Sequence, residues 1–220
     1  MPSVVYHLRF ADGRDVVLPA GTDAAAPAEA PDWTRLDYRQ CPNCPLSVAD
    51  TPRCPLALRL VPLITAVATF QSFDTVEVRV ETAERSVHKT TTVQRAVGAV
   101  MGLLAGASAC PHMGFLKPLA HFHLPFATEE ETIYRVASAY LLAQYFRLQQ
   151  GDQPDWALAG LKASYQELQR VNTALAARLR GAVQQDGAVN GLILLDLLAK
   201  ALPYSIDEQL EEIQTLFDVR

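Results

Sequence analysis

Hydrophobic and polar residues alternate over several short runs in the first half of the chain, as they do in β-strands with one buried face. The pair Asp12-Gly13 lies between two such runs and favours the tight turn of a hairpin. The pattern therefore predicts a small antiparallel sheet. The predicted strands lie at Tyr6–Phe10, Val16–Leu18, 33–40, 75–81 and 87–92, and the third of them leads directly into Cys41.

Most of the remaining chain carries apolar residues at intervals of three and four, which predicts helices. Thr128 and Glu131 form a T-x-x-E capping box at the start of one of them, and Pro203 separates the last two. Between residues 155 and 182 the apolar positions form the narrow seam along which two helices pack. The predicted helices lie at 51–70, 92–106, 128–149, 155–182, 190–202 and 205–217.

Together these elements predict an α+β fold. A small N-terminal antiparallel sheet packs on a mostly helical body, followed by a C-terminal helical hairpin and a final helix. The stretch Gly151–Pro154 marks a boundary between a domain at 1–150 and a helical segment at 151–220, unless the segment belongs to the same domain. We expect the C-terminal helices to bind a protein partner or a second copy of the chain.

The composition of the 220 residues is that of a soluble globular protein, with half of them hydrophobic. The net charge of −5 disfavours general nucleic-acid binding, which needs a basic surface. Residues 96–116 are uncharged and nominally long enough to span a bilayer, but a proline, a histidine and four glycines favour a buried helix. With no pattern of a secretory signal, we expect a cytoplasmic protein that does not enter the membrane and whose thiols stay reduced.

Each of the four cysteines is followed directly by proline. The run CPNC at 41–44 resembles, over these few residues, the knuckles of zinc ribbons and rubredoxins, where two thiolates on one turn bind a metal. The third cysteine is predicted in the first turn of a helix, where free amides favour thiolate. The sequence thus predicts one metal centre that ties the sheet to the helical body. Its ligands are Cys41, Cys44, Cys54 and Cys110.

Zinc is the expected metal of this centre, and the chain is then a non-catalytic interaction or regulatory module. An iron–sulfur cluster on the same four cysteines is the alternative, and it predicts an electron-transfer or redox-sensing protein. A redox-active CxxC dithiol is disfavoured because the strand–CxxC–helix pattern of thioredoxin-like folds is missing.

Three histidines follow the last cysteine closely: His112, His121 and His123. If extended, the H-x-H pair points both rings to one side, as two metal ligands require. The three residues suggest a metal-dependent hydrolase, or additional or substitute ligands for the thiolate centre. Since there is no HExxH motif, hydrogen bonds from these rings to backbone carbonyls are the favoured interpretation. Whether the protein is an enzyme stays an open question, and no catalytic motif in the sequence favours it.

Basic residues gather in the middle of the chain, around the predicted start of the helix at 92–106. If they converge there, they can bind a phosphate or a carboxylate. Glutamates are interleaved with them, however, so a solvent-exposed face of paired charges is favoured. The basic residues are Arg79, Arg85, His88, Lys89 and Arg95.

Overall fold

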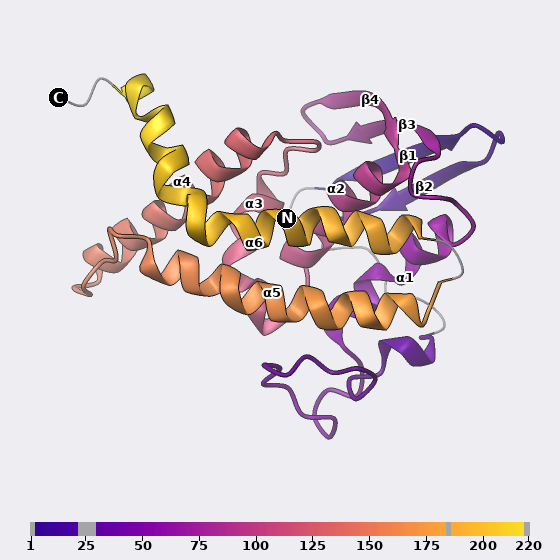
Figure 1. Cartoon of the computed structure of the whole chain (residues 1–220), viewed down its shortest axis with the longest axis horizontal. Helices are drawn as coiled ribbons and strands as arrows, with labels where there is room; N and C mark the ends of the chain where they lie inside the picture. The colour runs from indigo at the N-terminus through magenta and orange to yellow at the C-terminus, as the bar shows by residue number, and fades with distance from the viewer. Residues whose placement is uncertain (1–2, 22–29, 184–185, 218–220) are drawn as a thin grey trace.

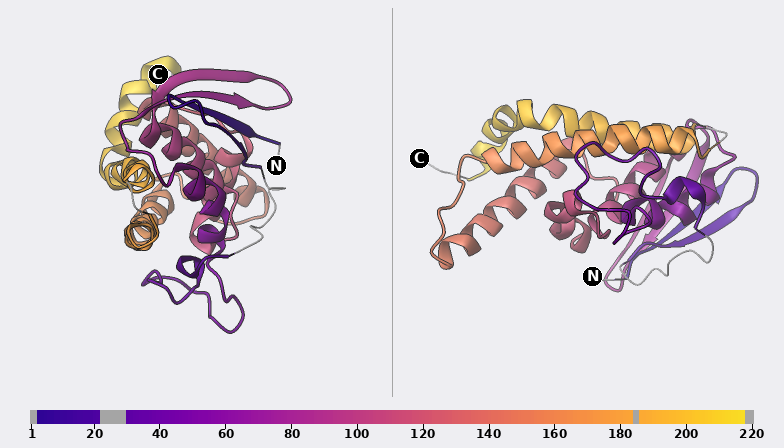
Figure 2. Two further views of the ribbon diagram at one scale, coloured as in Figure 1. Left: turned by 90° about the vertical axis from the view of Figure 1, so that its right-hand side faces the viewer. Right: turned by 90° about the horizontal axis from the view of Figure 1, so that it is seen from below.

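The computed structural model describes residues 3–21, 30–183 and 186–217, and within these ranges it contains one four-stranded sheet and six α-helices. The sheet lies at one end of the molecule, and the helices extend away from it (Figure 1). The helices lie on one face of the sheet (Figure 2). This arrangement confirms the predicted α+β fold with its N-terminal antiparallel sheet and C-terminal helices.

The sheet has the strand order β2-β1-β3-β4, and every neighbouring pair is antiparallel. Its inner face is apolar because alternate residues of each strand point to the same side. Tyr6, for example, is opposite Leu18 in β2 and Val80 in β3, and all three are buried. The hairpin turn uses Gly13 at a positive φ of 87°. The strands are β1 (Val5–Phe10), β2 (Asp15–Pro19), β3 (Thr75–Glu81) and β4 (Ser86–Thr92).

The helix α2 is at the centre of the helical body, where it packs against α1, α3 and α6. Its glycines permit this packing: a Cβ atom on Gly98 would lie 3.3 Å from the backbone oxygen of Gly191 in α6. A Cβ on Gly106 would lie 2.8 Å from the Cβ of Ala120 in α3. The helices are α1 (Pro55–Val67), α2 (Val93–Gly106), α3 (Lys117–His121), α4 (Glu129–Gln149), α5 (Ala159–Arg180) and α6 (Gly187–Gln214).

The capping box predicted at the start of α4 is present. The Glu131 amide donates to the Thr128 hydroxyl (3.1 Å), and the Thr128 amide donates to the Glu131 carboxylate (2.7 Å). Side chains from both sides of residue 150 join one hydrophobic core, including Leu60 of α1 and Leu161 of α5. The domain boundary at that position stays a prediction.

The strand predicted at 33–40 is wrong. This segment contains a short 3-10 helix, Asp32–Thr34, then turns, with a single bridge between Arg35 and Arg53. The reason lies in α5, whose buried Arg178 donates hydrogen bonds to the backbone carbonyls of Trp33 (2.5 Å) and Arg35 (2.6 Å). These carbonyls bind a guanidinium instead of a neighbouring strand.

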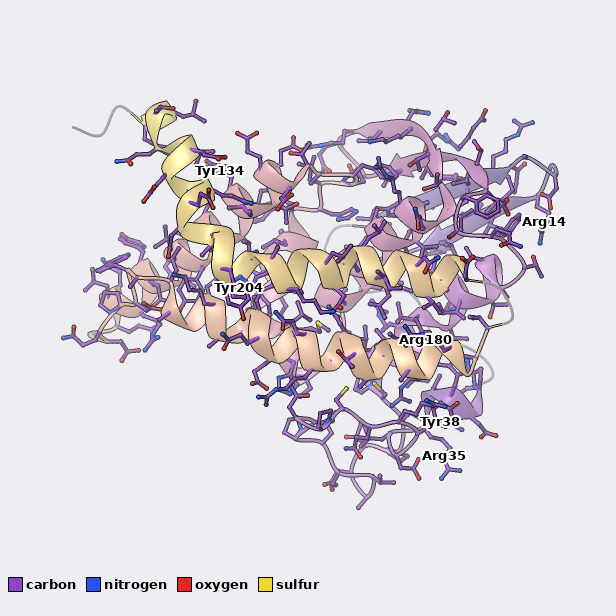
Figure 3. All side chains as sticks on the ribbon, in the orientation of Figure 1. Arg14, Arg35, Tyr38, Tyr134, Arg180 and Tyr204 are labelled. Carbon is purple, nitrogen blue, oxygen red and sulfur yellow. The ribbon has the colours of Figure 1, made fainter. Side chains whose placement is uncertain are left out.

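The last two predicted helices form one continuous helix, because α6 runs through Pro203. Figure 1 shows the helix bending near this point, and Figure 3 shows Tyr204 beside the bend. Leu202 and Ile206 are fully buried on either side of the proline. Tertiary packing on both flanks therefore holds the helix together across a residue that lacks an amide hydrogen.

Candidate functional site

The four cysteines lie along one small cavity, which we call the thiol pocket, although they come from separate parts of the chain. Cys41 and Cys44 share a turn, closed by a 3.0 Å hydrogen bond from the Cys44 amide to the Cys41 carbonyl. Cys54 and Cys110 each precede the first residue of a helical segment. The cavity measures about 20 Å³, and leucine, valine and proline side chains complete its wall together with His112 and Arg178.

Burial makes two thiols of this pocket, Cys41 and Cys110, weaker acids than an ordinary cysteine. It raises the pKa of Cys41 to about 12, and the neighbouring cysteines add to the rise because thiolate charges would repel one another. It also raises the pKa of Cys110, although backbone amides of His112 and Met113 partly offset the effect. Cys41 and Cys110 are therefore protonated at neutral pH, and all four cysteines are free of disulfide bonds.

These findings correct the predicted metal centre. In the part of the chain that the structure describes, no three or more His, Cys, Asp or Glu side chains are grouped so that they could hold a metal ion. The function as a zinc-site module is therefore wrong, and so is the alternative of an iron–sulfur electron-transfer or redox-sensing protein. The physical reason is geometric: the four cysteines come from separate segments of the chain, and although they line one small cavity, their side chains are not grouped as the ligands of one ion.

The three histidines near the last cysteine point to different surroundings. His112 Nε2 donates to the backbone carbonyl of Asn43 (2.7 Å). His123 Nε2 is hydrogen-bonded to the Tyr6 hydroxyl (2.5 Å), and His121 is exposed. Since the described residues contain no group that could hold a metal, the hydrolase alternative is wrong, and a backbone carbonyl is the partner of His112.

A second cavity, of about 390 Å³, lies around α2, and we call it the leucine pocket. Its volume falls within the range of small-molecule sites, about 300–1,000 Å³. The lining comes from all six α-helices, from β4 and from the segments on either side of α3. Leu56 and Leu175 line both pockets, so the two cavities share a wall. Other leucines that line this pocket include Leu103, Leu116, Leu168 and Leu195.

The charged residues that line the leucine pocket are all basic: Lys89 of β4, Arg95 of α2 and Arg135 of α4. None of its described lining residues is Asp or Glu. Lys89 is opposite Val78 in the sheet and therefore shares its inner face; its ammonium group lies 5.3 Å from the centre of the Phe126 ring. Arg95 is exposed and forms no hydrogen bond or ion pair with another described residue. The pocket thus combines an apolar lining with an excess of positive charge.

Arg135 and His123 hold the segment 116–127 in place along this pocket. Arg135 donates hydrogen bonds to the carbonyls of Leu119 (3.1 Å) and Phe122 (2.6 Å). Burial, with a smaller contribution from the Arg135 charge, lowers the pKa of His123 to about 4. The ring is therefore neutral at physiological pH, and its partner Tyr6 is a phenol whose pKa is raised by burial.

One polar side chain of the pocket has no partner for a buried atom. Asn172 of α5 is 5% exposed, and its Nδ2 atom has no hydrogen-bond acceptor among the described residues. An amide nitrogen left in this state costs about 1–3 kcal/mol of stability. Native proteins rarely leave such groups unpaired, so Asn172 is a position at which a ligand or a water molecule can contribute an acceptor.

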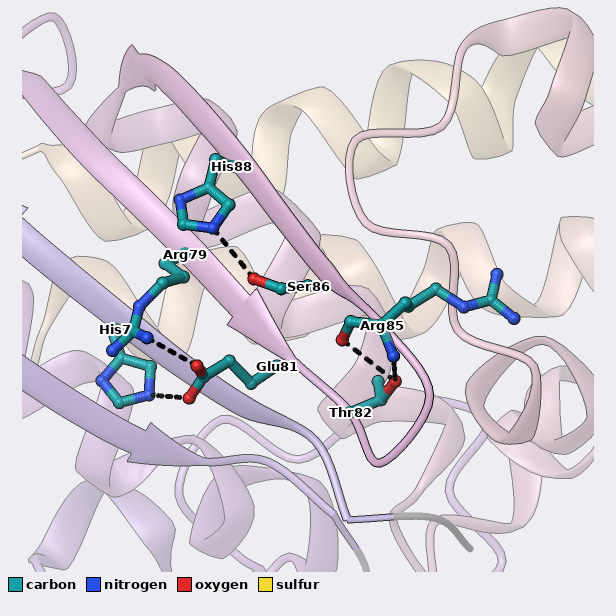
Figure 4. A network of polar contacts seen from close by, with 7 residues as sticks. All are labelled: His7, Arg79, Glu81, Thr82, Arg85, Ser86 and His88. Carbon is teal, nitrogen blue, oxygen red and sulfur yellow. Dashed lines mark hydrogen bonds and ion pairs between the residues drawn. The ribbon is translucent and has the colours of Figure 1, made fainter.

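The other basic residues of the central segment lie away from the pocket. On the outer face of the sheet, Glu81 accepts hydrogen bonds from Arg79 (2.5 Å) and His7 (2.8 Å), and Arg85 lies at the β3–β4 turn (Figure 4). The predicted face of paired charges therefore exists here. Lys89 and Arg95, in contrast, reach the leucine pocket.

The seam predicted at 155–182 is packed inside the chain, where α5 lies along α6 (Figure 1). Leu161, Leu168 and Leu179 are buried there. A partner surface on the C-terminal helices stays a prediction. Large apolar side chains that are exposed on α4 and α6 include Leu142, Phe146, Leu197 and Tyr204.

One described helix contains a stretch long and apolar enough to cross a membrane, Gly187–Tyr204 in α6. About half of this stretch, 47%, is buried inside the protein, where α6 packs on α2 and α5. The uncharged segment at 96–116 is not straight, because α2 and the helical segment Pro111–His121 meet at 107°. This packing is compatible with a soluble protein.

One residue in the sequence, Asn172, pointed to the leucine pocket, but it lies within a helical apolar pattern that was interpreted as helix packing. Asn172 lies four residues after Leu168 and three before Leu175, so it interrupts the apolar seam with a polar side chain. The basic residues at 89 and 95 belong to the set for which the sequence suggested a phosphate or carboxylate site, although a face of paired charges was favoured. The cavity itself had no signal, because its lining comes from many segments.

The chain belongs to a family described as Domain of unknown function (DUF6901), whose family model matches residues 4–218. A search of curated proteins and a search of solved structures each found no significant match. The function has to be argued from the site itself.

Proposed function

We propose that this protein binds an apolar carboxylic acid in the leucine pocket. The observation that carries the proposal is that a leucine-lined cavity of about 390 Å³ has three cations and no described acidic residue in its lining, although the chain has a net charge of −5. The hydrocarbon part gains about 25 cal/mol for each Å² removed from water. The acid group gains charge-assisted hydrogen bonds.

The position of the cations supports an acid group that stays close to solvent. Lys89 and Arg95 are exposed, so a carboxylate between them keeps part of its hydration and avoids the large cost of burying a charge. Arg95 has donors that no other described residue uses, and a guanidinium binds a carboxylate through two parallel hydrogen bonds. A neutral apolar molecule would leave these groups unused.

We propose binding rather than catalysis, since the pocket's histidine is already hydrogen-bonded to Tyr6 and its Arg135 to backbone carbonyls. A cytoplasmic location is part of the proposal. The four free cysteines support it, because reducing compartments keep thiols in this state.

Isothermal titration calorimetry with dodecanoic acid and with the neutral analogue 1-dodecanol tests the proposal on the purified full-length chain. We expect the acid to bind about tenfold more tightly than the alcohol, which is one charge-assisted interaction of about 1.5 kcal/mol. Arg95→Gln should reduce this preference. Arg85→Gln is the matched control, because Arg85 is exposed at the β3–β4 turn and does not line the pocket.

A variant that fills the cavity locates the binding. A Cβ on Gly102 would lie 3.9 Å from Leu195, an ordinary contact, so Gly102→Leu projects into the pocket without a backbone clash. We expect Gly102→Leu to lose dodecanoic acid binding and Gly102→Ala to keep most of it, with thermal melts showing that both fold. The proposal fails if dodecanoic acid does not bind, or if its affinity is the same in Gly102→Leu.

A further inference from the structure

The amide of Asn172 adds a requirement to the ligand of the leucine pocket. Asn172 lies between Leu168 and Leu175 on the wall of α5, and these three side chains are all buried. Its Nδ2 atom is a buried donor with no acceptor among the described residues. A hydrocarbon chain in this position would leave the donor unpaired, whereas a ligand oxygen would satisfy it.

We infer that the ligand carries a second, uncharged oxygen remote from its acid group, so that it is a hydroxy or oxo acid. The inference rests on the proposed function, because the second oxygen is placed relative to an acid bound at Lys89 and Arg95. These two residues are exposed, and Asn172 is 5% exposed. In the proposed pose, a linear ligand places its acid group at the two exposed residues and extends the other end of its chain towards the buried amide.

The second oxygen has to be neutral. The Asn172 amide offers hydrogen bonds but no full charge, and a buried carboxylate without a cation costs several kcal/mol. A hydroxyl or carbonyl oxygen accepts the Asn172 hydrogen bond at a much smaller desolvation cost. The pocket thus predicts a hydroxy or oxo acid over a dicarboxylic acid.

A water molecule is the alternative acceptor for this donor, and the residues of α5 that line the pocket offer it few further partners. A buried water needs two to four polar partners to be stable. Tyr165, which is also buried on the α5 wall, lies seven residues from Asn172, or about 10.5 Å along the helix. Leu168 and Leu175 are the pocket-lining residues of α5 nearest to Asn172 in the sequence, and they offer no hydrogen bond.

Calorimetry with matched acids tests the inference on the full-length chain. The probes are octanoic, decanoic and dodecanoic acid, each compared with its ω-hydroxy derivative, so that the length of the ligand need not be assumed. For the chain length that fits, we expect the hydroxy acid to bind about tenfold more tightly, which is the value of one buried hydrogen bond and of one donor no longer left unpaired.

Asn172→Leu removes the donor and keeps the pocket apolar. We expect this variant to reverse the preference, binding the plain acid at least as well as the wild type does and the hydroxy acid about tenfold less tightly. Thr173→Ala is the matched control, since Thr173 is exposed on the same helix and bonds only to the Gln169 carbonyl. It should leave both affinities unchanged.

The outcomes separate this inference from the proposed function. If neither kind of acid binds, the proposed function fails and the inference fails with it. If plain acids bind as tightly as their hydroxy derivatives at all three lengths, or if Asn172→Leu leaves the preference intact, the inference alone is overturned. A preference for the hydroxy acid that disappears in Asn172→Leu supports it.

Discussion

The thiol pocket and the leucine pocket share Leu56 and Leu175 in their walls, yet they differ in what they can hold. The thiol pocket measures about 20 Å³, close to the minimum of about 10–15 Å³ that one water molecule requires. The leucine pocket measures about 390 Å³ and contains an unpaired donor and cations without acidic partners. A concentration of reactive side chains therefore does not by itself make a binding site. The proposed binding site differs from the thiol pocket in its larger volume and in its unpaired buried donor.

We expect the largest effect at the thiol pocket, whose residues should stabilise the fold and not bind a ligand. Arg178 is 3% exposed, and it donates to the carbonyls of Trp33, Arg35 and Leu36. Arg178→Ala leaves these buried carbonyls unpaired and should lower the free energy of unfolding by about 4 kcal/mol, measured by urea denaturation. Arg180→Ala is the exposed control and should change it by less than about 0.5 kcal/mol.

Truncating one side chain in the wall that the two pockets share should make the cysteines of the thiol pocket more accessible. Leu175→Ala deletes a buried side chain that lines both, and we expect a loss of about 3 kcal/mol in the free energy of unfolding. Because the raised pKa of Cys41 makes it a slow nucleophile, iodoacetamide should label Cys41 slowly at pH 8 in the wild type and faster in Leu175→Ala, as peptide mass spectrometry measures.

Leu168→Ala is the control for this change, because Leu168 lines the leucine pocket only. It should destabilise the protein without faster cysteine labelling. Equal labelling rates in the two leucine variants would show that the wall does not separate the pockets.

The smallest expected effect concerns His123 on the side of the leucine pocket. Its pKa is lowered to about 4 in the folded protein, below the ordinary value of about 6.5. The unfolded chain therefore binds the proton more tightly, and stability is lost as the pH falls from about 6.5 towards 4. Between pH 7 and pH 5 we expect a decrease of about 2 kcal/mol from this residue.

Urea denaturation at the two pH values measures this effect. His123→Gln should remove most of the decrease, whereas His121→Gln, at an exposed position, should retain it. A wild type that is equally stable at pH 5 and pH 7 would contradict the buried, neutral state of His123.

Local patterns predicted the elements whose partners lie nearby in the chain. The alternation of Tyr6, Leu8 and Phe10 around the turn at Gly13 predicted the first hairpin, and the four strands of the sheet were all expected. The capping box at Thr128 was predicted from four residues, because both of its hydrogen bonds join residues three positions apart. For such features the sequence was sufficient.

Other features depended on residues far away in the chain. The alternation at 33–40 did not become a strand, because Arg178 of α5 binds its carbonyls. The Cys-Pro repeats predicted a metal centre, which is wrong, and they gave no sign that burial raises the pKa of Cys41 and Cys110. Spacing alone does not report the dielectric environment of a thiol or the direction in which it points.

The sequence by itself determined the class of fold, the strands of the sheet and the helical content, because propensity and periodicity act over a few neighbouring residues. Tertiary structure alone decided that α6 continues through Pro203, that the cysteines do not form a metal site, and that Asn172 faces a cavity with a basic lining. A cavity is the space left when distant segments pack, so no single stretch of sequence encodes it.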